Sequence, residues 1–235
     1  MIDSLGWGAL AASSLVVGAV LGLVRSWSDT LVGLVLGFGA GALIASVSFE
    51  LAEEGLRIGG AWPVAVGLAL GGATFYLADR WVESRSSGRG GAAGATLALG
   101  AFLDGIPEQA VLGIGLAQGQ GVSMALLVAI FASNLPEAIG SASDMRSSGR
   151  SPRQVLGLWA VVAAACALAT TGGFLAADAV SSQTSALVDG FAAGALLTML
   201  IDSMIPEAKD KAKDLAGLAT VVGFALAAGL SLISG

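Results

Sequence analysis

The sequence contains no histidine, a single cysteine (Cys166) and few charged residues, which make up 12% of its 235 positions. The absence of histidine excludes imidazole metal ligands and histidine-based pH switches. One cysteine rules out an intramolecular disulfide and a zinc cage built from several thiolates. The sequence also lacks a Gly-x-Ser-x-Gly nucleophile elbow and a phosphate-binding loop. These features do not indicate an enzyme, and we expect no cofactor.

Apolar residues account for 55% of the chain, and its mean hydropathy is +0.84. A soluble domain carries about 25% charged residues, roughly twice the fraction present here. The sequence therefore predicts an all-α integral membrane protein whose partner is the lipid bilayer, and it gives no indication of nucleic-acid binding. Residues 1–235 form one transmembrane domain with eight spans of about 20 residues, long enough to cross about 30 Å of hydrocarbon. The spans are 5–24, 30–52, 61–81, 92–117, 121–144, 153–177, 185–205 and 215–234.

The basic residues predict the orientation of these spans. With both termini outside the cytoplasm, ten of the eleven Lys and Arg residues fall in cytoplasmic loops, and only Arg57 lies outside. This distribution follows the positive-inside rule and supports an even number of spans. We expect the chain to reside in a prokaryotic plasma (inner) membrane. The ten cytoplasmic residues are Arg25, Arg80, Arg85, Arg89, Arg146, Arg150, Arg153, Lys209, Lys211 and Lys213.

Two apolar segments in the fourth and fifth spans each contain Pro followed by Glu, at Pro107-Glu108 and Pro136-Glu137. The segments match at an offset of 29 residues, so that 104–108 (DGIPE) aligns with 133–137 (SNLPE). A carboxylate in an apolar span costs about 2.5 to 3.5 kcal/mol on insertion scales and therefore indicates a partner or a function. Proline also frees the carbonyl four residues earlier. The pattern predicts an ion site.

The acids of this site fall on defined helix faces. Asp104 and Glu108 are spaced i and i+4, as are Ser133 and Glu137, so each pair shares a face. The carbonyls of Leu103 and Ala132 are the acceptors that proline frees. Three carboxylates at one depth repel one another, so we expect at least one to be protonated without metal and metal binding to release protons.

A second repeat relates residues 37–55 to residues 190–208. The segments GFGAGALIASVSFELAEEG and GFAAGALLTMLIDSMIPEA share Gly-Phe, Ala-Gly-Ala-Leu and a final Glu. In the predicted topology the two segments run in opposite directions, as do the fourth and fifth spans. We therefore expect inverted repeats, with spans 1–3 and 6–8 arranged around the central pair of spans 4 and 5. Inverted repeats with broken helices at the midplane are typical of transporters, although channels can share them.

The glycines and tryptophans predict how the spans pack. Four Gly-x-x-x-Gly series place small residues on one helix face and indicate close helix contact. Trp7, Trp27, Trp62, Trp81 and Trp159 lie near span ends, where we expect interfacial anchors. We expect Cys166 to be a small buried apolar residue. Glu50, Glu53 and Glu54 are either an exposed outer helix end or a funnel that attracts cations, and for two of the three we expect exposure.

Eight spans, external termini and the two Pro-Glu motifs resemble the ZIP (Zrt/Irt-like) family of divalent metal transporters over the whole chain. The resemblance implies transport of divalent cations toward the cytoplasm, a metal site between the fourth and fifth spans, and a homodimer. Glu108 and Glu137 match the glutamates that bridge two metals in the family. Asp104 stands where the family motif has His, and its Asn ligand is missing. Asn134 keeps a usable carbonyl, Ser133 is a weak ligand at best, and Asp202 matches a helix 7 position that can serve as a gate or secondary ligand.

These substitutions leave a site dominated by oxygen donors. Zinc prefers nitrogen and sulfur, whereas oxygen ligands suit manganese, magnesium, calcium or iron(II). We therefore expect selectivity to shift away from zinc, with manganese, zinc, iron and cadmium all candidate substrates, or one bound metal instead of two. Two alternatives stay open: a non-transporting membrane receptor or interaction protein with a degenerate metal site, and a carrier of another cation.

Overall fold

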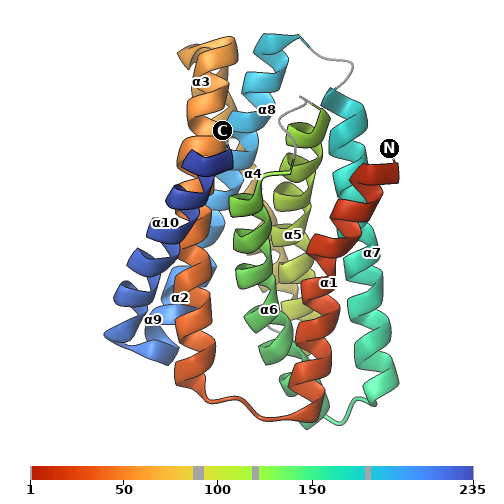
Figure 1. The fold of residues 1–235 in the computed structure, drawn as a ribbon. Helices are drawn as coiled ribbons and strands as arrows, with labels where there is room; N and C mark the ends of the chain where they lie inside the picture. Colours follow the sequence, from red (N-terminus) through yellow and green to blue (C-terminus); the bar gives the residue numbers. More distant parts are fainter. Residues whose placement is uncertain (1, 87–92, 118–121, 178–180, 235) are drawn as a thin grey trace.

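The computed structural model describes residues 2–86, 93–117, 122–177 and 181–234, and within these ranges the chain is helical apart from short connections (Figure 1). Two π-helical turns, η1 and η2, interrupt otherwise continuous helices, so that α2, η1 and α3 form one rod of 31 residues and α8, η2 and α9 form another. The described residues thus make eight helical rods, which confirms the predicted all-α class. The elements are α1 (Ile2–Val24), α2 (Asp29–Ser46), η1 (Val47–Ala52), α3 (Glu53–Gly59), α4 (Ala61–Ser86), α5 (Ala93–Ala117), α6 (Met124–Ser147), α7 (Pro152–Ala177), α8 (Ser182–Met199), η2 (Leu200–Met204), α9 (Ile205–Ala212) and α10 (Leu215–Ser234).

Seven rods of the described chain are long and apolar enough to cross a membrane. The remaining predicted span, the fourth at 92–117, corresponds to α5, a helix of 25 residues whose side chains up to position 104 lie outside the described part. Both ends of the chain lie at the end of the bundle that carries α3, as expected for an even number of rods (Figure 1). The connections after α1, α6 and α9, which hold Arg25, Arg150 and Lys213, lie at the opposite end.

The two π turns extend their rods beyond the predicted span boundaries. The spans predicted at 30–52 and 185–205 continue as helix to Gly59 and Ala212. The added segments, α3 and α9, are rich in charged residues, so the apolar run ends before the helix does. The two π turns also begin at matching positions. Val47 and Leu200 are 153 residues apart, which is the offset between the aligned segments 37–55 and 190–208. A π turn inside an α-helix is rare and occurs often at functional sites.

Glycines bring pairs of helices into backbone contact. A Cβ placed on Gly71 of α4 would lie 1.9 Å from the carbonyl oxygen of Phe191 in α8, and one on Gly194 would lie 2.2 Å from that of Leu68. The α2 and α10 helices pack in the same way, since a Cβ on Gly223 would lie 1.9 Å from the carbonyl oxygen of Phe38. These contacts confirm the predicted role of the glycines in close packing.

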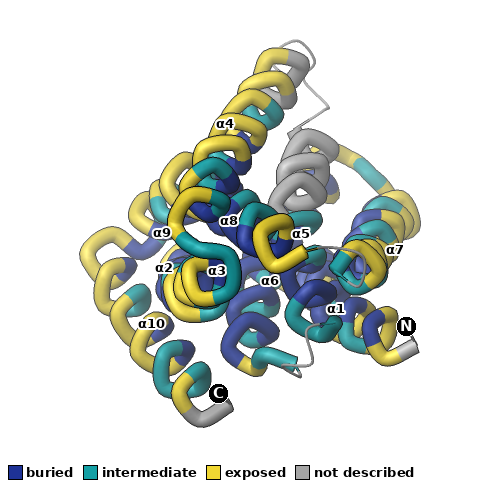
Figure 2. Tube along the Cα trace, turned by 90° about the horizontal axis from the view of Figure 1, so that it is seen from above, coloured by how far each residue is buried: buried dark blue, intermediate teal, exposed yellow. Residues whose placement is uncertain are grey.

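The bundle has a buried centre (Figure 2), and its outer surface carries many large apolar side chains. In the most apolar stretch of each rod, 67% of residues are buried in the α2 rod and 61% in α6, against 17% in α10. Large apolar side chains such as Leu218 and Val221 on α10 and Val161 and Leu168 on α7 are more than 60% exposed. In water such a surface would aggregate, whereas lipid tails would cover it.

The prediction that Trp159 is an interfacial anchor is wrong. Trp159 of α7 has no exposed surface and packs in a buried cluster with residues of α1 and α6, including Leu15 and Met145. Trp62 and Trp81 are 78% and 53% exposed, as an anchor requires. Position near a span end therefore does not distinguish an anchoring tryptophan from one that faces a neighbouring helix.

Candidate metal site between α5 and α6

The two Pro-Glu motifs lie inside helices that pack against each other. Pro107 lies within α5 and Pro136 within α6, and both helices continue beyond the proline. The Ala132 carbonyl, expected to be freed by Pro136, lies against α2, where its oxygen is 2.9 Å from a Cβ placed on Gly39. This acceptor therefore faces the α2 backbone. The matching prediction for Leu103 stays a prediction, since its surroundings lie outside the described part.

Glu108 is completely buried and contacts α6 through Ser133. The Ser133 hydroxyl donates to the carboxylate, at 3.3 Å from Oε1 and 3.5 Å from Oε2, and it also lies 3.0 Å from the carbonyl oxygen of Ile130. A hydroxyl has one proton, so these acceptors share a single donor. The carboxylate therefore receives only a long hydrogen bond from Ser133, which leaves much of its charge to be compensated by other groups.

Glu137 brings a second carboxylate to the same region. It is half-buried on α6, one turn beyond the buried Ser133, and lies close enough to Glu108 for the two groups to interact electrostatically. The sequence has no Lys or Arg between Arg89 and Arg146. Two neighbouring carboxylates in a poorly hydrated environment repel each other unless a cation or a proton lies between them.

The structure describes the other predicted ligands, Asn134, Asp104 and Asp202, to different extents. Asn134 is buried beside Ser133, and its Nδ2 has no hydrogen-bond partner among the described residues. Asp104 lies in α5, but its side chain lies outside the described part. Asp202 lies in η2 with an exposed side chain, and no described contact joins it to Glu108 or Glu137. Within the described residues, no three His, Cys, Asp or Glu side chains form a group ready to hold a metal.

The structure also brings Cys166 to this site. The residue is fully buried in α7, and its Sγ would lie 2.7 Å from a Cβ placed on Gly105, one turn before Glu108 in α5. It is close enough to Glu108 to interact with it electrostatically. Cys166 is thus buried as predicted, but it borders the carboxylate site and adds a sulfur atom to an otherwise oxygen-rich set. In the sequence, Thr170 is the signal for this position: it is spaced i+4 from Cys166 and therefore lies on the same face of α7.

Gln109 is a second buried polar group, next to Glu108 in the first Pro-Glu motif. Its Oε1 accepts a hydrogen bond of 2.6 Å from the Thr170 hydroxyl of α7, and its Nε2 has no partner among the described residues. The backbones approach closely beside it, since a Cβ on Gly113 would lie 1.9 Å from the Thr170 carbonyl oxygen. This contact fixes α5 against α7 directly next to Glu108.

Comparison with known proteins supports the resemblance to metal transporters. No model of a known protein family matches the chain. A protein of Arabidopsis thaliana described as a putative zinc transporter is 31% identical over 186 residues, which is 75% of this chain. The chain spans 30% of the length of that relative. The similarity agrees with the resemblance carried by the Pro-Glu motifs and the helical membrane fold, and it identifies the chain as a distant, histidine-free relative of the ZIP transporters.

Proposed function

We propose that the chain carries divalent metal cations across a membrane, toward the cytoplasm, through the site between α5 and α6. The observation that carries this proposal is that the buried Glu108 and the half-buried Glu137, contributed by two proline-containing helices whose own spans hold no Lys or Arg, lie near each other. A divalent cation would neutralise both carboxylates at once. The described relative, a putative zinc transporter, supports a metal as the substrate.

The remaining donors would complete the coordination and set selectivity. We propose that Asn134 and Asp104 contribute oxygen ligands, with Ser133 orienting Glu108 through its hydroxyl. Oxygen donors suit manganese or iron(II), whereas a thiol at Cys166 would favour zinc or cadmium. Asp202, whose side chain is exposed in η2, stays a prediction as a gate or secondary ligand.

Alternating access would follow from an inverted repeat of the two long rods. The α2 and α8 rods run in opposite directions along the bundle (Figure 1), and both contain a π turn at matching positions. These features support the proposal that spans 1–3 and 6–8 are related by an axis in the membrane plane. We also propose that the chain lies in a prokaryotic plasma membrane with both termini outside the cytoplasm, and that it forms a homodimer.

Metal uptake into proteoliposomes tests the proposal. Wild-type protein should accumulate at least one of manganese, zinc, iron(II) or cadmium, and Glu108→Gln/Glu137→Gln should abolish that uptake. Asp214→Asn is a matched control, because the Asp214 side chain is fully exposed and distant in sequence from the site. Magnesium and calcium in the same panel test how far oxygen donors alone decide selectivity.

Failure of this experiment has a defined meaning. If folded wild-type protein takes up none of these metals, the transport proposal is wrong, and a membrane receptor or interaction protein that retains the scaffold becomes the better description. If the double variant transports as well as Asp214→Asn does, the ion follows another path and the carboxylates are structural. Uptake of a monovalent cation in place of these metals would instead support a carrier of another ion.

A further inference from the structure

A second acidic region lies where α3 meets α8, away from the site between α5 and α6. Asp189 of α8 is 3% exposed, and its Oδ2 has no hydrogen-bond partner among the described residues. The side chain lies against α3, since a Cβ placed on Gly55 would be 3.4 Å from the Asp189 Cβ. Asp189 is seven residues into α8 from Ser182, about 10 Å along the helix from its start. A buried carboxylate with an unpartnered oxygen is costly unless another group compensates it.

Glu54 is the neighbouring acid, and it forms an ion pair with Arg57. Arg57 donates through Nη2 to Oε1 of Glu54 at 2.5 Å and through Nε to Oε2 at 2.7 Å. Asp189 is close enough to Glu54 to interact with it electrostatically. The Arg57 side chain is 69% exposed, whereas that of Glu54 is 16% exposed. The guanidinium thus sits mostly in the outer environment and neutralises one acid of a pair that lies deeper.

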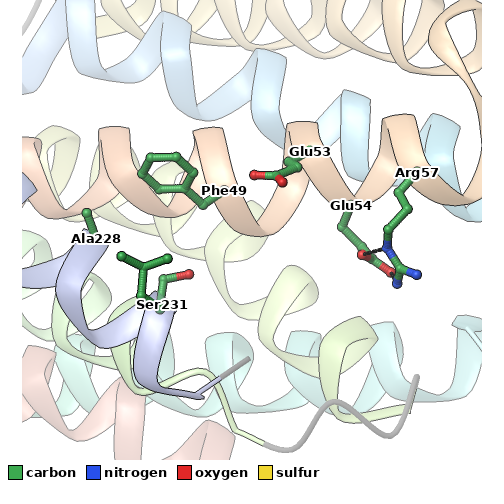
Figure 3. A pocket seen from close by; sticks show the side chains of 7 residues that line it. Phe49, Glu53, Glu54, Arg57, Ala228 and Ser231 are labelled. Atoms are coloured by element: carbon green, nitrogen blue, oxygen red, sulfur yellow. Dashed lines mark hydrogen bonds and ion pairs between the residues drawn. The ribbon is translucent and has the colours of Figure 1, made fainter.

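A pocket of about 380 Å³ gives access to Glu54 (Figure 3). Phe49, Glu53, Glu54 and Arg57 line one side from the α2 rod, and residues of α10, Ala228 among them, line the other. The pocket therefore offers an acidic wall and space for retained water on the Glu54 side of this region, while Asp189 is not among the residues that line it. Glu53 is exposed, whereas Glu50 and Glu54 are partly buried, so the expectation that two of these three acids are exposed is wrong.

This region is separate from the Glu108 and Glu137 pair. Glu50, one turn before Glu54, accepts a hydrogen bond of 2.6 Å from Ser123, the residue that caps the start of α6. From Ser123 to Glu137 the helix advances 14 residues, about 21 Å. Measured along α6, the outer acids are thus far from Glu137. They lie at the end of the bundle that carries the chain termini (Figure 1).

We propose that Glu54 and Asp189 form a second, outer binding site for divalent cations, for which Arg57 is the competing counter-ion. A divalent cation with several retained waters needs few protein ligands, and two carboxylates supply its charge balance. Its arrival would displace the guanidinium from Glu54 and compensate Asp189 at the same time. A site with two ligands and a built-in competitor binds weakly, which suits a position that loads and releases ions. The role of this site as a loading position rests on the proposed function, whereas cation binding at the site does not.

Equilibrium binding of Mn²⁺ to purified protein in detergent tests this site. The measurement uses Glu108→Gln/Glu137→Gln as the background, so that the inner pair no longer contributes. We expect this background to retain one weak Mn²⁺ site, and Asp189→Asn added to it to lower the affinity at least about tenfold. Arg57→Gln should raise the affinity roughly two- to fivefold, because it removes a partly exposed ion pair that competes with the metal. Asp214→Asn is the matched control and should change nothing.

The Arg57→Gln result separates a cation site from a structural network. If the three residues only stabilise the packing of α3 on α8, removing the exposed arginine leaves Mn²⁺ affinity unchanged, and this result would overturn the proposal. Absence of Mn²⁺ binding in the double-glutamine background, with binding in the wild type, would overturn it as well. Outer binding without uptake by the wild type would refute the transport proposal alone, whereas uptake without outer binding would refute the outer site alone.

Discussion

The glycine contact between α2 and α10 allows a quantitative test with two variants of one helix. In Gly223→Ala the new Cβ would lie 1.9 Å from the carbonyl oxygen of Phe38. A carbon and an oxygen normally approach to about 3.3 Å, so α10 would have to withdraw by roughly 1.4 Å. Overpacking of this kind costs about 1 to 3 kcal/mol. Gly217, in the same helix, is exposed and has no atom within 4 Å of a Cβ placed on it, so Gly217→Ala meets no obstacle.

Because both substitutions replace glycine by alanine in α10, the gain in helix propensity of about 1 kcal/mol is common to them and cancels in the difference. Gly223→Ala should therefore unfold with a free energy about 1 to 3 kcal/mol lower than that of Gly217→Ala. The assay is reversible unfolding in mixed micelles, followed by the loss of helical circular dichroism. Equal stability of the two variants would refute the argument that backbone contact, and not composition, explains this glycine.

Three other predictions concern single contacts. Ser123→Ala should cost about 2 kcal/mol, since it removes both the cap of α6 and the hydrogen bond to Glu50, whereas Ser28→Ala removes only the cap of α2 and should cost about 1 kcal/mol in the same unfolding assay. Thr170→Val should destabilise the protein by about 1 to 3 kcal/mol by removing the donor to Gln109, and Gln109→Leu added to it should recover part of the loss. Cys166→Ser should lower cadmium uptake relative to manganese uptake in a mixed-metal competition, and an unchanged ratio would show that the thiol does not contact the ion.

Hydropathy predicted the helices well because an apolar run is a property of one helix. The apolar runs correspond to the eight helical rods, seven of which are candidate membrane spans among the described residues, and α5 contacts α6, as expected for the helices that carry the matched Pro-Glu motifs. The boundaries of the long rods did not follow, since charged residues in α3 and α9 end an apolar run without ending a helix. A helix that protrudes beyond the apolar layer can satisfy its backbone internally, whatever its side chains.

The side-chain contacts of the site were less predictable, for a different physical reason. In a chain that is apolar almost everywhere, the polar faces that normally reveal the inward side of a helix are missing. Trp159 and Cys166 both face neighbouring helices, and the sequence marks their face of α7 only weakly, through Thr170 one turn beyond Cys166. Asp189 had a signal that sequence reasoning missed: it is an acid inside the predicted span 185–205, where charge is costly.

The π turn η1 lets the α2 rod hold one extra residue without turning the outer acids. Each residue of an α-helix turns the chain by about 100°, whereas each residue of a π turn turns it by roughly 80°, because its hydrogen bonds join residues five apart. The six residues Val47–Ala52 therefore turn the chain about as far as five residues of regular helix would. Deleting one of them would shorten the rod but leave Glu54 and Gly55 on nearly the same faces of α3, whereas a deletion within regular helix would turn both by about 100°. The wide turn is thus the place in this rod where a single codon can be lost while the outer acids keep their neighbours.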